Sequence, residues 1–531
     1  MVEMMPSVSL VEALMSSSKY TILAVVITCL TSSYIVFTIF YRLYFSPLSH
    51  FPGPRIAVPY YHDVILGGKY IWELEGLHKT YGPIVRTKPN MVHINDPEFI
   101  DQLYTGPSRR RDKTEFFCNG VPQFNNTVAF GTQSHELHKQ KRAPLNAFFS
   151  KKSVRRIEPI LHDKVSKILE ILRQHGESGT PVNLKLLYTA TNNDIITEYS
   201  FGKSWDSLVA DDLNTDFFDA FHNFPKAFHV NCYHPWVNSL MMRLPQRIIE
   251  KLMPPLKIAI PFFEKVTRHV EELKAVGSSD KGEKPSVIRD LFDSNIPDEE
   301  KTTARLSVEG QHLLAGGTDS GSHMLTSITY HLLANPDKLA KLKKELMAVM
   351  PDENIMPECM AVETLPYLNA VILETFRIHT PVGFTMERIA PDEDLEYKSS
   401  KDGKTYIIPR GVIVGMTPIL LGRIESLYPD PDVFRPERFI ENPDLERFQM
   451  PFGRGTRRCV GVNLATAELH LILAAVFRKF ELWDGTGMQK GQTMELYKTT
   501  REDVDVAAVS ILPFIKEARK GVNVVVRNRS T

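Results

Sequence analysis

The chain has 531 residues, 43% of them apolar and 24% charged, so it can bury a large core and has no composition typical of disorder. Lysine plus arginine equals aspartate plus glutamate at 63 each, which argues against a nucleic-acid partner, because such a partner requires a basic face. The five cysteines follow no repeated pattern, which excludes a disulfide framework and fits a reducing compartment.

The first apolar segment, residues 20–41, contains no charged side chain. As a helix it would be about 33 Å long, enough to cross the hydrocarbon layer of a membrane. A cleaved signal peptide is disfavoured, because the stretch is long and lacks a small-x-small cleavage site. Basic residues are more numerous after it than before it, which predicts a cytosolic C-terminal part. We expect a lumenal segment over residues 1–19 and a single-pass anchor over residues 20–41 in the endoplasmic reticulum membrane.

A hinge over residues 42–55 follows the anchor and contains Pro47, Pro52 and Pro54. Such a proline-rich stretch is stiff and extended, and it would set the orientation of the next domain against the membrane. Residues 56–531 are expected to form one catalytic domain, since no internal repeat divides them.

Within this domain the pattern is mostly helical. Apolar residues recur at helical spacing over residues 154–201 and again after residue 304. The runs Ile84–Thr87 and Met91–Ile94 are strand-like and flank a turn, which predicts a hairpin. The polar segment 275–285 is interpreted as a surface loop inside the domain.

Two patterns allow both a structural and a functional interpretation. The run 138–142, His-Lys-Gln-Lys-Arg, would by composition alone form a solvated basic face. Phe217, Phe218, Phe221 and Phe228 crowd one helical region, where they fit either ordinary core or an apolar access channel near the membrane.

The segment 307–335 is predicted to be one long helix that ends before a proline. Two adjacent glycines in its middle, Gly316 and Gly317, are costly in a helix, and Asp319 and Ser320 follow closely. Together these residues favour local widening or a kink. By themselves they support a packing kink and a functional groove equally.

Glu374 and Arg377 lie three residues apart in the helical stretch 367–379, so both side chains share one face. Such a pair is common, and alone it would be a solvated surface pair worth well under about 1 kcal/mol. Arg438 follows within a Pro-Glu-Arg-Phe run shortly before a glycine-rich loop.

That loop, residues 452–461 (FGRGTRRCVG), places Cys459 in a cationic setting just before an apolar helix. Arg457 and Arg458 precede the cysteine, and the following helix supplies free N–H groups, so the setting favours a thiolate. A thiolate held in this way is a good axial ligand for haem iron. Zinc would require further ligands at short spacing, and a buried structural cysteine is the remaining alternative.

The spacing F-x-x-G-x-R-x-C-x-G, with Phe452 and Cys459 at fixed positions, resembles the haem-binding loop of the cytochrome P-450 family. The E-x-x-R pair, the P-E-R-F run and this loop also follow one another in that family's order. The resemblance extends from about Phe51 to the C-terminus. In detail the chain is similar to fungal secondary-metabolism members of the family such as trichodiene oxygenase. It implies a mainly α fold, a helical haem domain with small peripheral β-sheets, preceded by the N-terminal transmembrane helix. It also implies haem b, with Cys459 as the iron ligand.

The resemblance assigns roles to further residues. Asp319 and Ser320 match the acid and alcohol of the oxygen-activating helix, with serine where threonine is usual. Glu374, Arg377 and Arg438 match a structural network that locks the core beside the haem. The implied haem contacts, including propionate partners, are Cys459, Arg457, Phe452, Arg142, His138, Arg388 and Gly317. His138 replaces the usual tryptophan, which leaves open whether it bonds a propionate or merely packs.

The implied function is a membrane-anchored monooxygenase that inserts one oxygen atom of O2 into an apolar small molecule of terpenoid or polyketide type. NADPH electrons would arrive through a separate NADPH–cytochrome P-450 reductase, because the chain has no nucleotide-binding glycine motif or flavin domain. The partners are thus this reductase, an apolar substrate and membrane lipid. One alternative is a haem-thiolate isomerase, dehydratase or peroxygenase, against which Asp319 and Ser320 argue. Another is a haem sensor without turnover.

Overall fold

The computed structural model describes residues 10–55, 59–241, 243–276, 286–486, 488–516 and 520–529. Helices predominate in these ranges, as the resemblance implied. The longer ones are α1 (Leu10–Tyr44), α2 (Tyr70–Tyr81), α5 (His135–Phe148), α7 (Glu158–Ser178), α8 (Leu184–Phe201), α9 (Thr215–Asn223), α13 (Pro254–Val276), α15 (Thr303–Ala334), α16 (Pro336–Val349), α18 (Pro366–Ile378) and α21 (Val462–Lys479). The shorter ones are α3 (Ile100–Leu103), α4 (Glu115–Gly120), α6 (Lys151–Arg156), α10 (Phe228–Tyr233), α11 (Pro235–Met241), α12 (Gln246–Leu252), α14 (Val287–Asp293), α17 (Cys359–Glu363), α19 (Pro418–Leu421) and α20 (Glu437–Glu441).

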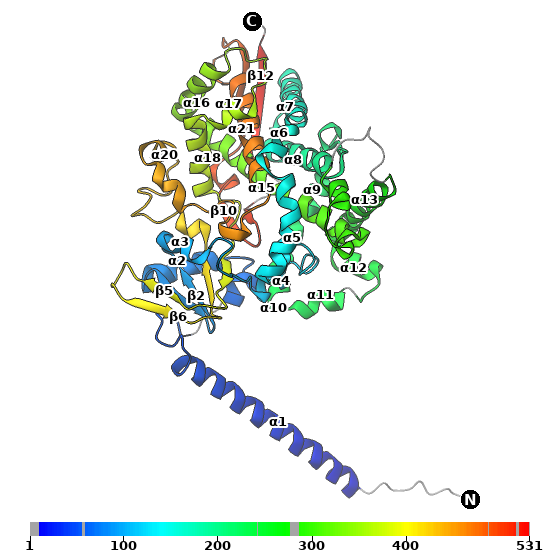
Figure 1. The fold of residues 1–531 in the computed structure, drawn as a ribbon, viewed down its shortest axis with the longest axis vertical. Helices are drawn as coiled ribbons and strands as arrows, with labels where there is room; N and C mark the ends of the chain where they lie inside the picture. Colours follow the sequence, from blue (N-terminus) through cyan, green and yellow to red (C-terminus); the bar gives the residue numbers. More distant parts are fainter. Residues whose placement is uncertain are drawn as a thin grey trace, which may run out of the picture.

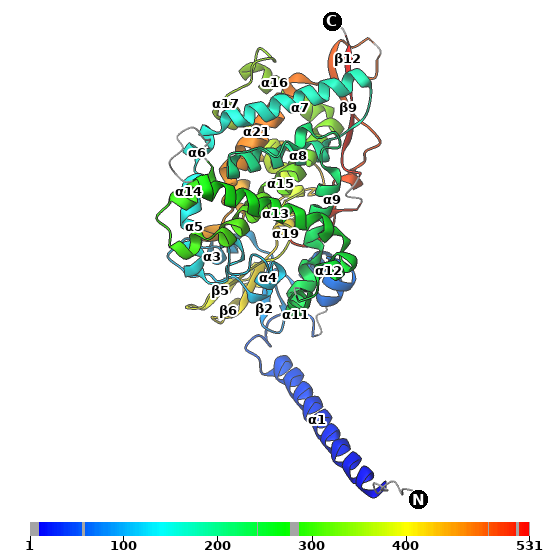
Figure 2. The same ribbon diagram turned by 90° about the vertical axis from the view of Figure 1, so that its right-hand side faces the viewer.

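Helix α1 projects away from the rest of the chain, with its N-terminal end far from the body (Figures 1 and 2). Its part Lys19–Tyr44 has a mean hydropathy of 2.2, and none of its most apolar stretch is buried. It is therefore long and apolar enough to cross a membrane. The helix begins at Leu10, so it also takes in the second half of the predicted lumenal segment, whose first nine residues lie outside the described ranges.

The hinge is docked on the domain, where the sequence predicted a stiff, extended stretch. Leu48 and Phe51 are buried, at 2% and 5% exposure, and Phe51 stacks at a tilt on Tyr406 with ring centroids 5.4 Å apart. The Arg86 N–H donates to the Pro52 carbonyl at 2.7 Å. Burial of these apolar side chains outweighs the stiffness of the prolines, so the hinge folds back onto the first sheet.

The strands form four small sheets. The first has the order β1-β2-β7-β4, the second β3-β12-β9-β8, and β5-β6 and β10-β11 are two-stranded. The bounds are β1 (Ile84–Lys88), β2 (Met91–Ile94), β3 (Val182–Asn183), β4 (Met386–Ile389), β5 (Leu395–Lys398), β6 (Thr405–Ile408), β7 (Ile413–Met416), β8 (Glu481–Leu482), β9 (Gly491–Leu496), β10 (Val506–Val509), β11 (Pro513–Ile515) and β12 (Asn523–Arg529). The predicted hairpin is confirmed, since β1 and β2 pair antiparallel.

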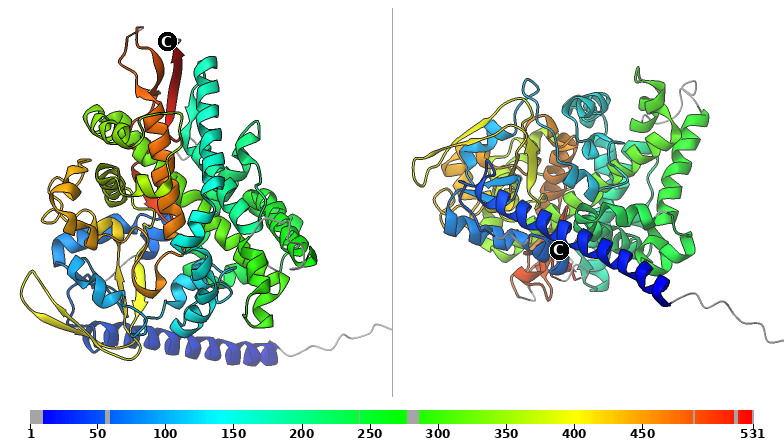
Figure 3. Two further views of the ribbon diagram at one scale, coloured as in Figure 1. Left: turned by 45° about the horizontal axis from the view of Figure 1, so that its top comes forward. Right: turned by 90° about the horizontal axis from the view of Figure 1, so that it is seen from below.

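The centre of the domain is made by helices packed on helices. Helix α15 contacts α8, α13, α18 and α21, and α8 also contacts α7 (Figure 2). All residues of α8 except Lys185 and Leu186 are buried, which is typical of a helix surrounded by protein. Figure 3 shows the strands β5 and β6 (yellow) on one side of the molecule and the green helices around α13 on the other.

Local signals fix the ends of these central helices. The Thr302 side chain accepts a hydrogen bond from the Arg305 N–H and so caps the start of α15, which ends at Ala334 before Pro336. Helix α8 stops at Gly202, a left-handed C-terminal residue with φ of 75°. Of the predicted loop 275–285, the first two residues end α13 and residues 277–285 lie outside the described ranges.

Candidate active site

The loop that holds Cys459 is shaped by two glycines and one backbone bond. Gly453 and Gly455 have φ of 69° and 67°, a conformation that favours glycine. A side chain on Gly455 would come within 2.4 Å of the Thr105 carbonyl oxygen, so this position also requires a residue without Cβ. The Cys459 N–H donates to the Phe452 carbonyl at 2.7 Å, which closes the loop three residues before α21 begins.

The Cys459 thiol is accessible to solvent, yet the surrounding protein raises its pKa above the ordinary value. Desolvation is the largest influence on this pKa, and it outweighs the lowering by the Gly461 N–H and by Arg142 and Arg458. The prediction that the loop alone favours a thiolate is therefore wrong for the ligand-free protein. Coordination of a metal cation deprotonates a thiol outright, so the thiolate would form on binding iron.

Arg457 does not contribute to the thiol in the way predicted. Its guanidinium donates to the carbonyls of Thr132 and Gln133, the latter at 2.8 Å. Arg142 takes the position beside the loop instead, because its Nη1 donates to the Arg458 carbonyl at 2.8 Å. Helix α5 thereby holds the segment that precedes the cysteine.

Phe452 lies at the other end of the loop and contacts the helical core. Its ring meets Phe376 of α18 edge to face, with centroids 5.2 Å apart. An edge-to-face pair of this kind adds about 0.5–1.5 kcal/mol beyond the area it buries. Phe452 thus fixes the loop to α18.

Four basic side chains gather around His138 of α5. The pKa of His138 is lowered to about 2, first by burial and then by the charges of Arg457, Lys113, Arg142 and Arg388. Hence His138 is neutral at physiological pH and can only serve as a hydrogen-bonding group. Burial together with Arg388 also lowers the pKa of Arg457, to about 9.

Carboxylates such as Glu387 and Asp112 act on this basic cluster only through their charge, and within the described part of the chain they form no ion pair with Arg388 or Arg457. None of Lys113, Arg388 and Arg457 forms an ion pair there, although the first two are 7% and 6% exposed. The buried Arg457 Nε also lacks a hydrogen-bond partner. Buried cations are costly unless an anion compensates them, so the cluster fits the two propionates of a haem.

Lys113 is a member of the cluster that sequence reasoning missed. Its Nζ donates to the Phe130 carbonyl at 2.6 Å and lies 4.2 Å from the ring centroid of Phe117. Burial, followed by the charges of Arg388 and Arg457, lowers its pKa well below the ordinary value. In the sequence it is one of several basic residues at positions 109–113, and only the fold distinguishes it from the exposed Arg109 and Arg110 and from Arg111, which is buried and paired with Glu393.

The glycine pair of α15 has two different surroundings. Space around a Cβ on Gly316 would be open, whereas a Cβ on Gly317 would come within 2.7 Å of Ile196 of α8. Gly317 therefore permits close helix packing, and the prediction that it faces the cofactor is wrong; Gly316 has the open side. The helix is continuous over Thr303–Ala334, so the glycine pair does not interrupt it.

Asp319 and Ser320 follow the open glycine. The Ser320 hydroxyl donates to the Gly316 carbonyl at 3.0 Å and so stays beside the open side of the helix. Asp319 is 6% exposed and accepts a hydrogen bond from Nδ1 of His222, on α9, at 2.8 Å. Although burial raises the pKa of Asp319, the charges of His222, Lys185 and His323 bring it below the ordinary value.

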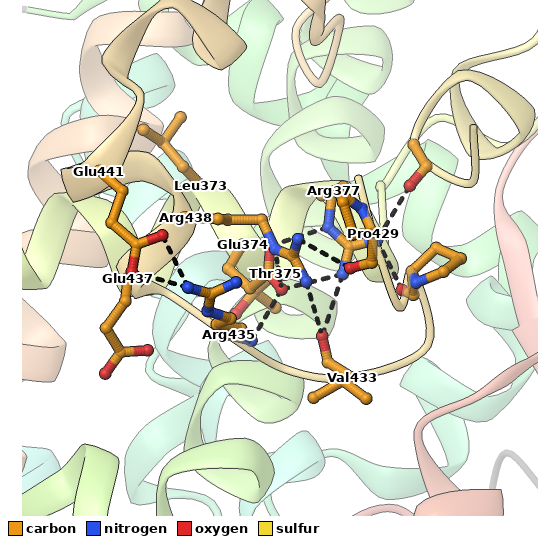
Figure 4. A network of polar contacts seen from close by, with 12 residues as sticks. Leu373, Glu374, Thr375, Arg377, Pro429, Val433, Arg435, Glu437, Arg438 and Glu441 are labelled. Atoms are coloured by element: carbon orange, nitrogen blue, oxygen red, sulfur yellow. Dashed lines mark hydrogen bonds and ion pairs between the residues drawn. The ribbon is translucent and has the colours of Figure 1, made fainter. Parts of the chain in front are cut away.

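Glu374 is the centre of the expected three-residue network (Figure 4). It is 0% exposed, and Arg377 donates to both its carboxylate oxygens, at 2.8 and 2.9 Å. The Arg438 Nε donates to the same carboxylate at 3.0 Å, and so does the Arg435 N–H at 2.8 Å. The remaining Arg377 donors bond to carbonyls of Gly422, Pro431 and Val433. Both guanidinium groups thus share one carboxylate and bond to backbone carbonyls as well, and α18 is tied to the segment before the cysteine loop.

The phenylalanines divide between core and site. Phe217, Phe218 and Phe221 pack into the main core, where Phe217 stacks on Phe262 with centroids 4.6 Å apart. Phe228 belongs instead to a separate aromatic cluster with Phe117, Cys118 and Cys232, against which Phe130 and Phe384 pack. Since Lys113 of the basic cluster lies over the rings of Phe117 and Phe130, this aromatic cluster adjoins the candidate haem site.

Comparison with known proteins gives a consistent result. The family described as cytochrome P-450 matches residues 52–501. The chain is 36% identical over 504 residues to cytochrome P-450 monooxygenase tpcC of Cochliobolus heterostrophus, which covers 93% of this chain and 95% of that protein. It is 34% identical to N-acetyltryptophan 6-hydroxylase ivoC of Emericella nidulans, over 96% of this chain and 97% of that protein. It is 32% identical to cytochrome P-450 monooxygenase TRI4 of Trichoderma arundinaceum, over 90% of each.

Proposed function

Because the chain belongs to the cytochrome P-450 family and its relatives are monooxygenases, we propose that it inserts one oxygen atom of O2 into an apolar small molecule. The single observation that carries the proposal is the accessible Cys459 thiol beside a buried basic cluster in which Lys113, Arg388 and Arg457 form no ion pair with any described residue. That combination offers a single bound cofactor both a sulfur ligand for its metal and cationic partners for its carboxylates.

Haem b is the cofactor that these residues suit. Cys459 would hold the iron, while Arg142, Arg388, Arg457 and Lys113 would compensate the propionates and neutral His138 would add a hydrogen bond. Bound haem supplies oxygen activation, which the electron donation of a thiolate ligand favours.

The residues of α15 have the positions needed to manage protons. The Ser320 hydroxyl lies next to the open side at Gly316, and by turning its one O–H away from the Gly316 carbonyl it can offer a hydrogen bond to a ligand in that space. Asp319 directly precedes Ser320 in the chain and is held as a charged acid by its neighbours. A hydroxyl next to the bound ligand, with an acid on its solvent side, can pass protons toward the ligand one at a time.

The substrate class is inferred from the aromatic cluster of Phe117, Phe228 and Phe384, which offers rings and no anionic or cationic specificity group of its own. A terpenoid or polyketide of secondary metabolism fits such a surface. NADPH electrons would come from a separate cytochrome P-450 reductase. The apolar α1 supports a single-pass location in the endoplasmic reticulum membrane with the catalytic domain in the cytosol.

The ligand assignment is tested by the absorption spectrum of the reduced, carbon-monoxide-treated protein. We expect the red-shifted band of a sulfur-ligated porphyrin, and we expect Cys459→Ala to abolish it. Cys359→Ala is the matched control, because this buried cysteine lies on α17 and its removal should leave the band in place. Persistence of the band in Cys459→Ala would refute the assignment.

The substrate class is tested by product analysis. The full chain is co-expressed with a reductase and supplied with a panel of terpenes, polyketides and charged aromatic acids. Oxygenated products from the first two groups, with incorporation of label from isotopic O2, support the proposal. Turnover restricted to the charged acids contradicts the apolar assignment.

A further inference from the structure

Among the residues that the structure describes, His222 is the one side chain outside α15 that bonds directly to Asp319. It comes from α9, 97 residues earlier in the chain, and the distance from its Nδ1 to Asp319 Oδ2 is 2.8 Å. The ring meets Phe514 of β11 edge to face, with centroids 5.0 Å apart. Its orientation is therefore fixed from two sides.

The hydrogen bond determines which ring nitrogen remains available. The carboxylate of Asp319 only accepts, so Nδ1 of His222 carries the donated proton, and in the tautomer whose single proton lies on Nδ1 the other nitrogen, Nε2, is an acceptor. This Nε2 is buried, and it has no hydrogen-bond partner among the described residues. A buried acceptor without a partner indicates that a water or another donor belongs beside it.

A small recess joins this histidine to the proton-handling residues of α15. Lys185, His222, Asp319, Ser320, His323 and Pro513 contribute to its lining. The recess has room for about one water molecule, and its polar groups are numerous enough to hold one. Asp319, Ser320 and His222 thus share the same enclosed space.

The other polar groups of the recess are less suited to move protons. Burial lowers the pKa of His323 to about 4, so it is neutral at physiological pH, and its Nε2 is engaged with the His379 carbonyl at 3.2 Å. Lys185, on α8, acts through its charge, which lowers the pKa of Asp319. An acid with so low a pKa is almost always deprotonated, and it needs a donor beside it to pass protons on.

We propose that His222 is a relay and positioning residue for Asp319, which receives protons through the recess and hands them to the acid. The Nδ1 proton passes to Asp319 Oδ2 while Nε2 takes a proton from the water in the recess, and that water regains a proton from bulk solvent. One proton moves inward, one N–H bond breaks as another forms, and the imidazole changes only its tautomer. This inference rests on the proposed function, since it supplies the protons that oxygen reduction consumes.

Two substitutions separate a relay from a merely structural hydrogen bond. His222→Gln keeps an N–H donor for Asp319 but cannot transfer a proton through its amide. His222→Phe removes both the donor and the relay and retains a ring to pack on Phe514. His162→Gln is the matched control, since His162 lies 3.7 Å from the Glu158 carboxylate on the surface helix α7.

The first measurement is independent of turnover. Infrared spectra of the full-length holoprotein are recorded as the pH is lowered, and Asp319→Asn identifies the Asp319 carboxyl band. In His222→Phe we expect Asp319 to protonate at a pH at least about 1 unit higher than in the unsubstituted protein. The desolvation that raises the pKa of Asp319 is then offset by fewer interactions that lower it. In His162→Gln the band should titrate as in the unsubstituted protein, whereas in His222→Gln it should titrate between the unsubstituted protein and His222→Phe, because the amide keeps the hydrogen bond but loses the charge of His222 that lowers the pKa of Asp319. An unchanged titration in His222→Phe would overturn the assigned pairing.

The second measurement uses reductase, NADPH and O2 as the only reactants. We expect His222→Gln to consume oxygen at least about tenfold more slowly and with a larger solvent deuterium effect, since a proton supply is lost. A purely positional histidine predicts that His222→Gln behaves like the unsubstituted protein, and that result would overturn the relay. If the unsubstituted protein consumes no oxygen, the proposed function itself is wrong. The pairing of His222 with Asp319 that the infrared titration measures is then the only part of the inference that remains.

Discussion

Glu468, on α21, is a buried carboxyl group that forms no hydrogen bond or ion pair with any residue the structure describes. Desolvation raises its pKa to about 8. A Cβ on Gly321 would lie 3.8 Å from its Oε2, and the neighbouring amide of Asn192 has no hydrogen-bond partner among the described residues. At neutral pH this carboxyl is therefore mostly protonated. Asp319, on the contacting helix α15, is by contrast charged.

This raised pKa makes the stability of the fold depend on pH. The folded state binds the proton of Glu468 more tightly than the unfolded state, so stability falls as the pH rises from the unfolded value near 4.5 through about 8. We expect Glu468→Gln to match the unsubstituted protein at about pH 5 and to exceed its stability by on the order of 4 kcal/mol at about pH 8.5. Thermal unfolding followed by circular dichroism measures this difference. The exposed Glu299→Gln should show no such pH dependence, and equal curves for both substitutions would contradict the prediction.

Individual site residues were predictable where they belong to a local pattern. Cys459 and Asp319 stand in short runs whose spacing alone resembles a family. Lys113 and His222 could not be found in this way, because their partners are distant in sequence and only tertiary packing brings them together. The protonation of the Cys459 thiol was mispredicted for the same reason, since desolvation depends on how the folded protein encloses it.

Among the secondary-structure elements, α18 and α20 depend on one another through Glu374. Both guanidinium groups, of Arg377 and Arg438, are buried with this carboxylate (Figure 4). Glu374→Ala leaves them without a counter-charge, and we expect a loss of about 3–5 kcal/mol in stability and little haem-loaded protein. Absorbance of bound haem per mole of purified protein measures the loading.

Glu441→Ala is the appropriate control for this substitution. Glu441 pairs with Arg435 close to the same network, but the two side chains are 56% and 46% exposed. An exposed pair contributes only about 0–1 kcal/mol, so haem loading should persist. Similar losses in both variants would mean that the buried network has no special importance.

The element boundaries show what periodicity can and cannot predict. The helical stretch 367–379 matches α18 (Pro366–Ile378), because its apolar spacing and starting proline are local signals. The glycine pair of α15 was predicted to distort the helix, but Gly317 is required by the close approach of Ile196, a contact invisible in the sequence. The hinge was likewise predicted to be extended, since its docking depends on apolar partners such as Tyr406, far along the chain.

At the scale of the whole molecule, the boundary between anchor and domain lies inside the predicted hinge. Among the α1 side chains that the structure describes up to Tyr41, all are exposed apart from a half-buried Thr38, whereas Leu48 and Phe51 are part of the domain's second core cluster. The chain therefore changes from a membrane-facing to a core-facing segment within a few residues.

Two truncations test this boundary. Removal of residues 2–41 should release the protein from membranes while changing its stability by no more than about 0.5 kcal/mol, since the segment adds nothing to the core. Removal of residues 2–55 also deletes two fully buried side chains and should cost at least about 3 kcal/mol. Vesicle flotation measures membrane association, and urea unfolding measures stability. Equal stability of the two truncated proteins would show that the hinge does not belong to the folded domain, and flotation of the shorter deletion would show that α1 is not the principal anchor.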